Sequence, residues 1–405
     1  MVTEGPARAG SDRRGGRMAE ADRVAAGALR GIRVADFSRV LAGPYATMTL
    51  ADFGADVIKV EPPGGDDTRH WIPPVDATGR ATYFGGVNRN KRSVALDLTD
   101  AAGLAEARRL AASADVVVEN FRPGVMARFG LAYEDVRAAN PGVVYCSITG
   151  FGTGEGAALA GYDLLVQAVG GLMSITGDPD GEPSKVGVAL VDVLTGQNAV
   201  AGILLALRER DRTGVGCLVE VTLLQSLLSA LTNQASSTLA TGTPPRRLGN
   251  QHPSIAPYAV FRAADRELVI AVGNDRQFGA LAGVLGSPGL ADDARFRTNA
   301  DRVAHRDELG EALERALAAA SARHWVDALT AAGVPAGLVN DVAEAIAFAD
   351  ALGLEPVAVT READDASAPH RSIANPIRVG GDGASYRTAP PALDADRGAD
   401  WRPRG

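Results

Sequence analysis

The chain is poor in the residues that build disulfide frameworks and metal centres. It has two cysteines, Cys146 and Cys217, and both lie in apolar, strand-like runs without paired spacing. Its five histidines are scattered and include no pair four residues apart. We therefore expect no disulfide framework and no metal, and we expect both cysteines to be small buried residues of a reducing cytoplasm.

The chain also lacks an excess of positive charge and a long apolar run. Lys and Arg number 41 against 49 Asp and Glu, a net charge of −8, so no basic field attracts nucleic acid. No apolar stretch approaches the roughly 20 residues of a membrane helix. Residues 1–30 are rich in Arg, Gly and Ala without the apolar core of a signal peptide, which predicts a disordered leader. We expect neither nucleic acid nor a membrane as a partner.

What is present is an ordinary globular composition, 46% hydrophobic and 22% charged over 405 residues, long enough for two domains. Residues 31–231 alternate apolar strand-like runs with helical patterns. This alternation predicts a large α/β, Rossmann-like domain whose parallel sheet is covered on both faces. The predicted strands are Ile32–Phe37, Val57–Glu61, Ser93–Leu98, Val116–Asn120, Val143–Ile148 and Cys217–Val221.

A smaller α+β domain is predicted over 249–340, after a small and polar linker at 232–248. It begins with a hairpin, Tyr258–Arg262 and Glu267–Val272, and continues with helices at Asp275–Leu285, Ala300–Ala320 and Ala322–Ala332. Residues 341–405 form a further linker and the C-terminal segment. In the last 40 residues only Ile373–Val379 is strand-like.

Two common enzyme classes lack their motifs. A strand, helix and strand with Glu61 at the second strand's end suit a dinucleotide site, but the first turn, 38–44, reads SRVLAGP instead of G-x-G-x-x-G. We therefore expect no nicotinamide cofactor. The G-x-S-x-G elbow of a serine hydrolase is missing as well.

Asp192 is the most informative single residue. It lies among apolar residues shortly before the predicted helix Gln197–Arg210. The partial positive charge of a helix N-terminus favours an ionised carboxylate, which predicts a partly shielded nucleophile. The alternative is an Asp that only caps the helix.

Polar side chains follow the ends of two predicted strands. Arg39 comes after the first strand, and Asn120, Arg122 and Arg128 follow the fourth. Ligands of open parallel sheets bind outside the carboxyl ends of the strands, so these residues predict an anion pocket. The alternative is that each Arg is a solvated surface residue.

Five segments carry a resemblance to a known family. They are residues 36–44 (DFSRVLAGP), 51–61 (ADFGADVIKVE), 88–93 (NRNKRS), 119–124 (ENFRPG) and 161–163 (GYD). In this order they resemble the family III CoA-transferases, the CaiB/BaiF group that includes formyl-CoA transferase-like proteins. The resemblance runs from about Gly31 to Pro390.

The resemblance implies an α/β fold in which the C-terminal part of 341–405 returns to the large domain, and a homodimer of two interlocked rings. It implies that Asp192 is catalytic and that Gly249, Asn250, Gln251 and His252 belong to a mobile substrate loop over the site. The implied coenzyme A positions are Arg39, Leu41, Ala42, Pro62, Leu96, Asp97, Leu98, Thr99, Asn120, Phe121, Arg122, Arg128, Ala160, Gly161, Tyr162 and Asp163.

The implied reaction moves coenzyme A from an acyl-CoA thioester to a carboxylic acid, with Asp192 carrying a covalent aspartyl-CoA intermediate. Backbone N–H groups near Asp192 and in the loop are the expected oxyanion donors. The loop resembles the version found with short dicarboxylyl donors such as succinyl-CoA. His252 is either an anion contact or a loop residue held for structural reasons.

Two alternatives are an α-methylacyl-CoA racemase and an inactive CoA-binding protein of the same family. Racemases of this family resemble the chain but carry His at the position of Tyr162. Racemisation needs groups that transfer a proton at the α-carbon, and Tyr, with a pKa near 10, is a poor base for that step. Retention of Asp192 argues against an inactive protein.

Overall fold

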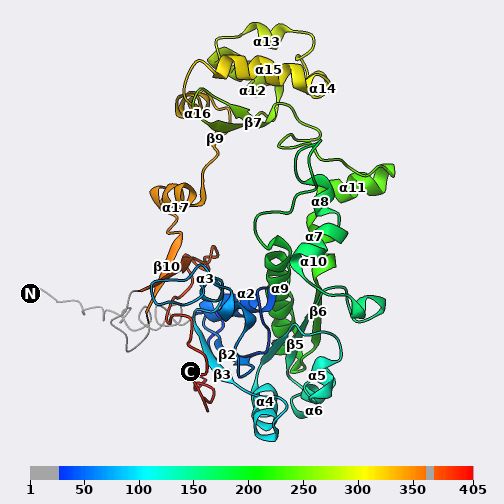
Figure 1. Ribbon diagram of the computed structural model, residues 1–405, viewed down its shortest axis with the longest axis vertical. Coiled ribbons are helices and arrows are strands. Elements are labelled where there is room, and N and C mark those ends of the chain that lie inside the picture. Colours follow the sequence, from blue (N-terminus) through cyan, green and yellow to red (C-terminus); the bar gives the residue numbers. More distant parts are fainter. Residues whose placement is uncertain (1–26, 362–368, 405) are drawn as a thin grey trace, which may run out of the picture. The chain divides into compact units, whose positions relative to one another are not determined.

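The computed structural model describes residues 27–361 and 369–404. It separates into two compact units (Figure 1). Unit 1 contains the described residues up to Gly170, Val188–Thr232 and the described residues from Leu354, and unit 2 contains Gly171–Gly187 and Asn233–Gly353. Gly171–Gly187 thus groups with the second unit, although the sequence places this segment in the large domain. Most of the predicted leader lies outside the described residues.

Unit 1 is built on a six-stranded parallel sheet with the strand order β3-β2-β1-β4-β5-β6. The strands are β1 (Arg33–Asp36), β2 (Asp56–Glu61), β3 (Lys91–Ala95), β4 (Val116–Glu119), β5 (Val144–Thr149) and β6 (Leu218–Thr222). The predicted parallel sheet is confirmed, and continuous Val, Ile and Ala runs form it because the central strands are buried on both faces. The strand order reverses between β1 and β4, which makes their carboxyl ends the switch point where ligands of such sheets bind.

Helices of unit 1 pack against this sheet. Ala107 and Leu110 of α4 and Val136 of α6 share one apolar core with strand residues such as Ile58 and Val117. Helices α2 and α9 pack on each other and on the sheet. The helices are α2 (Ala42–Asp52), η1 (Asp67–His70), α3 (Thr82–Gly86), α4 (Ala101–Ser113), α5 (Val125–Arg128), α6 (Tyr133–Ala139), η2 (Glu155–Ala158), α7 (Asp163–Val169), α9 (Leu190–Thr213) and α10 (Leu223–Ala230).

Unit 2 has a three-stranded antiparallel sheet of β7 (Tyr258–Arg262), β8 (Glu267–Ala271) and β9 (Ala336–Leu338). The predicted hairpin of β7 and β8 is present. Its helices are α8 (Leu172–Ile175), α11 (Thr232–Thr241), α12 (Asp275–Val284), α13 (Gly289–Asp292), α14 (Asn299–Ala304), α15 (Arg306–Leu317), α16 (Ala322–Ala331) and α17 (Val342–Ala351). Two expectations are wrong: α11 occupies the predicted linker, and the predicted helix Ala300–Ala320 is broken at His305 into α14 and α15.

The C-terminal segment of unit 1 is anchored along the edge strand β3. The carboxylates of Asp396 and Asp394 accept hydrogen bonds from the backbone N–H groups of Ser93 and Ala95, at 2.9 and 3.0 Å. The two carboxylates thus bind backbone N–H groups that an edge strand otherwise leaves without a partner. Trp401 is buried in the core beside α4. A two-stranded antiparallel sheet, β10 (Val357–Thr360) with β11 (His370–Ile373), precedes this anchor, and only part of the predicted strand Ile373–Val379 is strand.

Two sequence expectations need correction. Helix α9 is long and apolar enough to cross a membrane by length and composition alone. It packs against α2, α10, β5 and β6, as a core helix of a globular unit does. Cys146 is buried as expected, but Cys217 is exposed.

Candidate functional site

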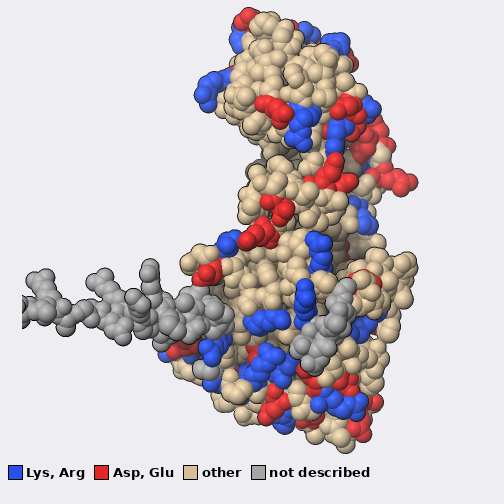
Figure 2. Space-filling model, turned by 90° about the vertical axis from the view of Figure 1, so that its left-hand side faces the viewer, with Lys and Arg blue, Asp and Glu red and all other residues tan. Residues whose placement is uncertain are grey.

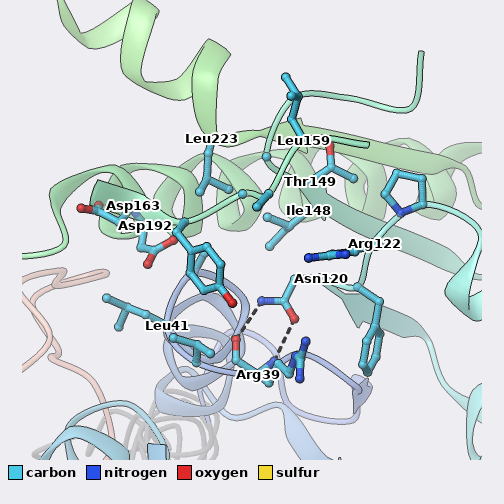
Figure 3. A pocket seen from close by; sticks show the side chains of 18 residues that line it. Arg39, Leu41, Asn120, Arg122, Ile148, Thr149, Leu159, Asp163, Asp192 and Leu223 are labelled. Carbon is cyan, nitrogen blue, oxygen red and sulfur yellow. Dashed lines mark hydrogen bonds between the residues drawn. The ribbon is translucent and has the colours of Figure 1, made fainter. Parts of the chain in front are cut away.

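A cavity of about 250 Å³ lies at the carboxyl ends of β1, β4 and β5, at the switch point of the sheet (Figure 3). It brings together most of the residues that the sequence singles out. Its lining consists of Arg39, Val40, Leu41, Ala42, Asn120, Phe121, Arg122, Pro123, Ile148, Thr149, Gly150, Leu159, Ala160, Gly161, Tyr162, Asp163, Asp192 and Leu223. Basic and amide groups from two strand ends therefore share one cavity with the Asp192 carboxylate.

The loops after β1 and β4 are joined by reciprocal hydrogen bonds. The backbone N–H of Arg39 donates to Oδ1 of Asn120 at 2.9 Å, and Nδ2 of Asn120 donates to the carbonyl of Arg39 at 2.7 Å (Figure 3). The Arg39 guanidinium lies 5.5 Å from the ring centre of Phe121. Val40 adopts a φ of 67°, a left-handed conformation that is costly for a β-branched residue. The loop shape is thus imposed by its surroundings.

Buried charges beneath the loop impose that shape. The Asp66 carboxylate accepts the N–H of Val40 at 3.2 Å and pairs with the Lys59 ammonium at 2.9 Å, and both side chains are about 1% exposed. Lys59 also donates to the carbonyl of Ser38 at 2.8 Å. Although burial opposes ionisation, the Lys59 charge and hydrogen bonds lower the pKa of Asp66 to about 2. Asp66 therefore stays ionised and keeps holding the loop at neutral pH.

Asp192 lies in the first turn of α9, because the helix begins at Leu190 and not at Gln197. The alternative of an N-cap Asp is wrong, since the N-cap position is Ala189. The expectation that the helix end favours the ionised form is also wrong. Burial, and secondarily the charge of Asp163, raise the pKa of Asp192 to about 7. Ionising Asp192 therefore costs folding free energy, so the folded state loses stability as the pH rises from the ordinary pKa of 3.8 through about 7.

The side chain that caps α9 is Asp163. Its Oδ2 accepts the backbone N–H groups of Val191 at 2.8 Å and of Asp192 at 3.2 Å, and its Oδ1 accepts Nε2 of Gln167 at 2.6 Å. The positive end of the helix is thus already occupied by one carboxylate, which explains why it does not stabilise a second one. The N–H groups of Val191 and Asp192 therefore already have an acceptor, and the expectation of oxyanion donors near Asp192 and in the loop stays a prediction.

Close backbone approaches place Asp192 and Tyr162. A Cβ on Gly196 would lie 2.7 Å from the carbonyl oxygen of Ala42, so only glycine lets α9 approach the start of α2. A Cβ on Gly161 would lie 2.7 Å from the Cα of Gly150. This close approach explains why residue 161 is glycine. The neighbouring residue, Tyr162, is 69% exposed.

A second cavity of about 270 Å³ adjoins the first, because Arg39 and Phe121 line both. The predicted coenzyme A positions Pro62, Leu96, Asp97, Leu98 and Thr99 line this second cavity. Arg128, at the end of α5, is exposed and lines neither cavity.

The predicted substrate loop belongs to unit 2. Gly249, Asn250 and Gln251 line a separate cavity of about 660 Å³ within that unit. Nδ1 of His252 accepts the backbone N–H of Ser254 at 3.1 Å, which favours the structural interpretation of this histidine. The role of the loop in catalysis stays a prediction.

Sequence reasoning missed several residues of the site. Gly150, Leu159 and Leu223 line the cavity, and Asp66 shapes it, without any motif that marks them. Only Gly150 carried a signal, since a glycine directly after a buried strand indicates close backbone approach. Among residues 27–361 and 369–404, no three His, Cys, Asp or Glu side chains come together as they would around a metal ion. The expected independence from metal stays a prediction.

The comparisons with known proteins agree with this geometry. The family model of CoA-transferase family III matches residues 29–397. A succinate–glutarate CoA-transferase from Agrobacterium fabrum is 47% identical over 301 residues, which cover 73% of this chain and 75% of that protein. An acetyl-CoA:oxalate CoA-transferase from Acetobacter aceti is 43% identical over 353 residues, which cover 86% of this chain and 88% of that protein.

A solved structure shares the fold. The crystal structure of a CaiB/BaiF family protein from Brucella suis superposes with a TM-score of 0.82 at 43% sequence identity, covering 91% of this chain and 97% of that one. An open parallel sheet with an acid and two arginines at its switch point defines an α/β enzyme that handles an anionic ligand. The chain belongs to CoA-transferase family III, and it is an enzyme of the CoA-transferase type.

We expect Asp163→Asn to shift the rise of activity with pH to lower pH. In the unaltered enzyme the ionised form of Asp192, which is the nucleophile in the expected reaction, accumulates as the pH rises through about 7. Asparagine keeps an oxygen for the N–H groups of α9 but removes the charge that helps to raise the pKa of Asp192. Burial, the larger cause, remains, so we expect a partial shift. The measurement is kcat against pH for both enzymes, and an unchanged profile or a shift to higher pH would contradict the electrostatic account.

Proposed function

We propose that the protein transfers coenzyme A from a short dicarboxylyl-CoA donor of the succinyl type to a carboxylic acid, through a thioester between Asp192 and coenzyme A. One observation carries the proposal. The Asp192 carboxylate lines the cavity at the switch point of the sheet together with Arg39, Asn120 and Arg122. An activated acyl group bound there meets a nucleophile on a rigid helix.

Each half of the proposed reaction exchanges one bond at a carbonyl carbon. The Asp192 carboxylate attacks the thioester carbon of the donor, the C–S bond breaks, and coenzyme A leaves as a thiolate. The thiolate then attacks the Asp192 carbonyl carbon of the mixed anhydride, and the donor acid leaves as a carboxylate. The acceptor carboxylate then attacks the carbonyl carbon of the aspartyl-CoA thioester and releases the thiolate. The thiolate attacks the acceptor carbonyl carbon of the new anhydride, which releases the product acyl-CoA and ionised Asp192. Covalent catalysis of this kind divides one difficult transfer into easier steps.

The surroundings of Asp192 support this role. A pKa of about 7 means that a substantial fraction of the carboxylate is ionised at neutral pH, while its basicity exceeds that of an exposed Asp. A more basic carboxylate is a better nucleophile, and no separate base is needed. Asp163 fixes the first turn of α9 through two N–H groups and so fixes the position of Asp192. Asp163 thereby acts as a positioning residue.

The two adjoining cavities support binding of an extended ligand. Arg39 lies at their junction, with one guanidinium nitrogen 3.4 Å from Asp67 and the group stacked near Phe121. A guanidinium suits the phosphate groups of coenzyme A, because its planar donors match phosphate oxygens. We propose that the nucleotide end occupies the second cavity, between Leu96 and Phe121, and that the pantetheine arm points toward Asp192.

We expect Asp192→Ala to lower CoA transfer by about 10³-fold or more, because the carboxylate that carries the covalent step is removed. CoA binding, measured by calorimetry, should change little, since the phosphate-binding side chains are untouched. The matched control is Asp211→Ala, an exposed acid at the other end of the same helix, which should retain full activity. Full turnover by Asp192→Ala would refute the mechanism.

Two measurements on the unaltered enzyme, CoA transfer and exchange of the α-hydrogen, separate the two alternatives within the family. An inactive CoA-binding protein would show no transfer in the unaltered enzyme. A racemase would exchange the α-hydrogen of a 2-methylacyl-CoA with solvent deuterium, and Tyr162 is an exposed phenol, a residue type whose ordinary pKa of about 10 makes it a poor base for that proton transfer.

The identity of the acyl donor is tested by comparing kcat/KM for two acyl-CoA thioesters. Relatives that are 40–47% identical are named as succinate–glutarate or succinyl-CoA:glutarate CoA-transferases. We expect kcat/KM for succinyl-CoA to exceed that for acetyl-CoA by about tenfold or more with the same acceptor, equivalent to about 1.4 kcal/mol of transition-state binding. Glutarate, mesaconate and oxalate serve as acceptors in parallel. A higher kcat/KM for acetyl-CoA with each acceptor would contradict the dicarboxylyl donor.

We also propose that the protein works as a homodimer. Helices α7, α9 and α10 pack together and leave large apolar side chains exposed, among them Val169 at 60% and Leu205 at 72%. Exposed apolar patches of this kind mark protein interfaces. We expect light scattering to give the mass of a dimer and Leu205→Glu to reduce it toward that of a monomer. Val215→Glu, at an exposed site beyond the end of α9, is the control. A monomeric unaltered protein would contradict the proposal.

A further inference from the structure

A small basic cavity lies at the edge of the sheet opposite to the catalytic one. It has a volume of about 310 Å³ and is lined by Arg30, Gly31, Arg33, Gly54, Asp56, Arg387, Arg402 and Pro403. Arg33 opens β1 and Asp56 opens β2, so the cavity lies at the amino ends of these parallel strands. Asp192 and Arg39 lie at the carboxyl ends, which separates this cavity from the proposed coenzyme A site.

The charges that line this cavity do not balance. Four guanidinium groups face one carboxylate, that of Asp56, which gives 4 − 1 = +3. The carboxylate is already used, because Arg92, which lies outside the lining, donates to both Asp56 oxygens at 2.8 and 2.7 Å. The Arg402 guanidinium approaches Asp56 only to 4.0 Å. The excess positive charge is therefore not neutralised by the acid at the cavity.

Two of the lining arginines have few acceptors within the protein. Nε of Arg33 is buried and has no hydrogen-bond partner among the described residues. Asp400 attracts the Arg33 charge, but its carboxylate is hydrogen-bonded to Arg109 at 3.0 Å. The Arg387 guanidinium donates to the carbonyl of Ala51 at 2.8 Å, and burial together with repulsion from Arg402 lowers its pKa. The guanidinium groups of Arg30 and Arg402 are exposed and line the cavity, so they are the donors that a bound anion can reach.

Two segments that are far apart in the sequence form the cavity. Figure 2 views the side on which the C-terminal segment lies in Figure 1, and several Lys and Arg side chains gather there on unit 1. The C-terminal segment contributes Arg387 and Arg402, and the N-terminal part contributes Arg30 and Arg33. The cavity therefore exists only when the C-terminal segment is docked on the sheet.

We propose that this cavity binds a small, multiply charged phosphate anion of the diphosphate type. Guanidinium groups match phosphate oxygens in pairs, and an excess charge of +3 suits an anion with more than one negative charge. The volume accommodates a diphosphate group but not a whole coenzyme A molecule. The diphosphate is either free or the end of a nucleoside diphosphate, and its binding ties the C-terminal segment to the start of β1.

Isothermal titration calorimetry of the full chain tests the site, with inorganic diphosphate and with ADP as separate ligands. We expect diphosphate to bind to the unaltered protein, and Arg30→Gln/Arg402→Gln to weaken that binding by about tenfold or more, because two charge-assisted contacts are lost. Both arginines are exposed, so the variant should fold. Arg212→Gln/Arg137→Gln, which removes the same charge from exposed sites elsewhere on unit 1, should bind like the unaltered protein.

The outcomes discriminate clearly. If ADP binds more tightly than diphosphate and the cavity variant loses this binding, the ligand is a nucleotide. If diphosphate binds more tightly than ADP and the cavity variant loses this binding, the ligand is free diphosphate. ADP that binds equally well to the cavity variant occupies another site and does not count as support. Absent diphosphate binding, equal affinity in the cavity variant, or succinate binding as tightly as diphosphate would overturn the proposal. CoA transfer by the cavity variant should equal that of the unaltered enzyme, since none of these residues lines the catalytic cavity.

Discussion

The site depends on one carboxylate that binds two backbone N–H groups of another segment. Asp163, at the start of α7, accepts Val191 N–H and Asp192 N–H at the start of α9. Hydrogen bonds to a charged acceptor are worth about 1.5–3 kcal/mol each, so this contact contributes more than an ordinary helix cap. It fixes where α9 begins, and therefore where the Asp192 side chain points. The same charge also raises the pKa of Asp192. Asp163 thus contributes to both the position and the basicity of the proposed nucleophile, although burial is the larger cause of the raised pKa.

The opposite wall of the cavity is fixed by a different means. The loop after β1 holds Val40 in a strained left-handed conformation, in which the Val40 N–H donates to Asp66, and Asp66 is itself paired with buried Lys59. Asn120 then joins this loop to the end of β4. A buried ion pair adds little net stability, but removing one partner leaves an uncompensated charge. Its contribution here is therefore a rigid loop geometry, which a site for an extended anionic ligand requires.

The sheet was predictable from the sequence, whereas the start of α9 was not. The run Val116–Val118 in β4 is apolar throughout, and a fully buried parallel strand is the simplest structure for it. Helix α9 begins at Leu190 behind Ala189, which supplies no side-chain cap, so the only local start signal in its first turn is the acidic Asp192. The capping group lies 28 residues earlier, at Asp163. A contact between segments so far apart has no trace in local periodicity.

Other failures have similar physical reasons. Helix α11 has the small and polar composition of a linker and buries none of its residues, so neither pattern nor burial marks it as a helix. The convergence of Arg39 with Asn120 was predictable, because the carboxyl ends of parallel strands meet at one edge. The raised pKa of Asp192 was not, because it depends on burial and on a second carboxylate that only the folded chain brings close.

The most direct measurement of the central claim is peptide mass spectrometry after trapping. The enzyme is incubated with succinyl-CoA, quenched with hydroxylamine, digested and analysed for hydroxamates. A covalent intermediate on Asp192 predicts a hydroxamate on that residue alone, present with succinyl-CoA and absent when the donor is omitted. A protein that turns over succinyl-CoA without any modification of Asp192, or with the hydroxamate on a different carboxylate, would contradict the account.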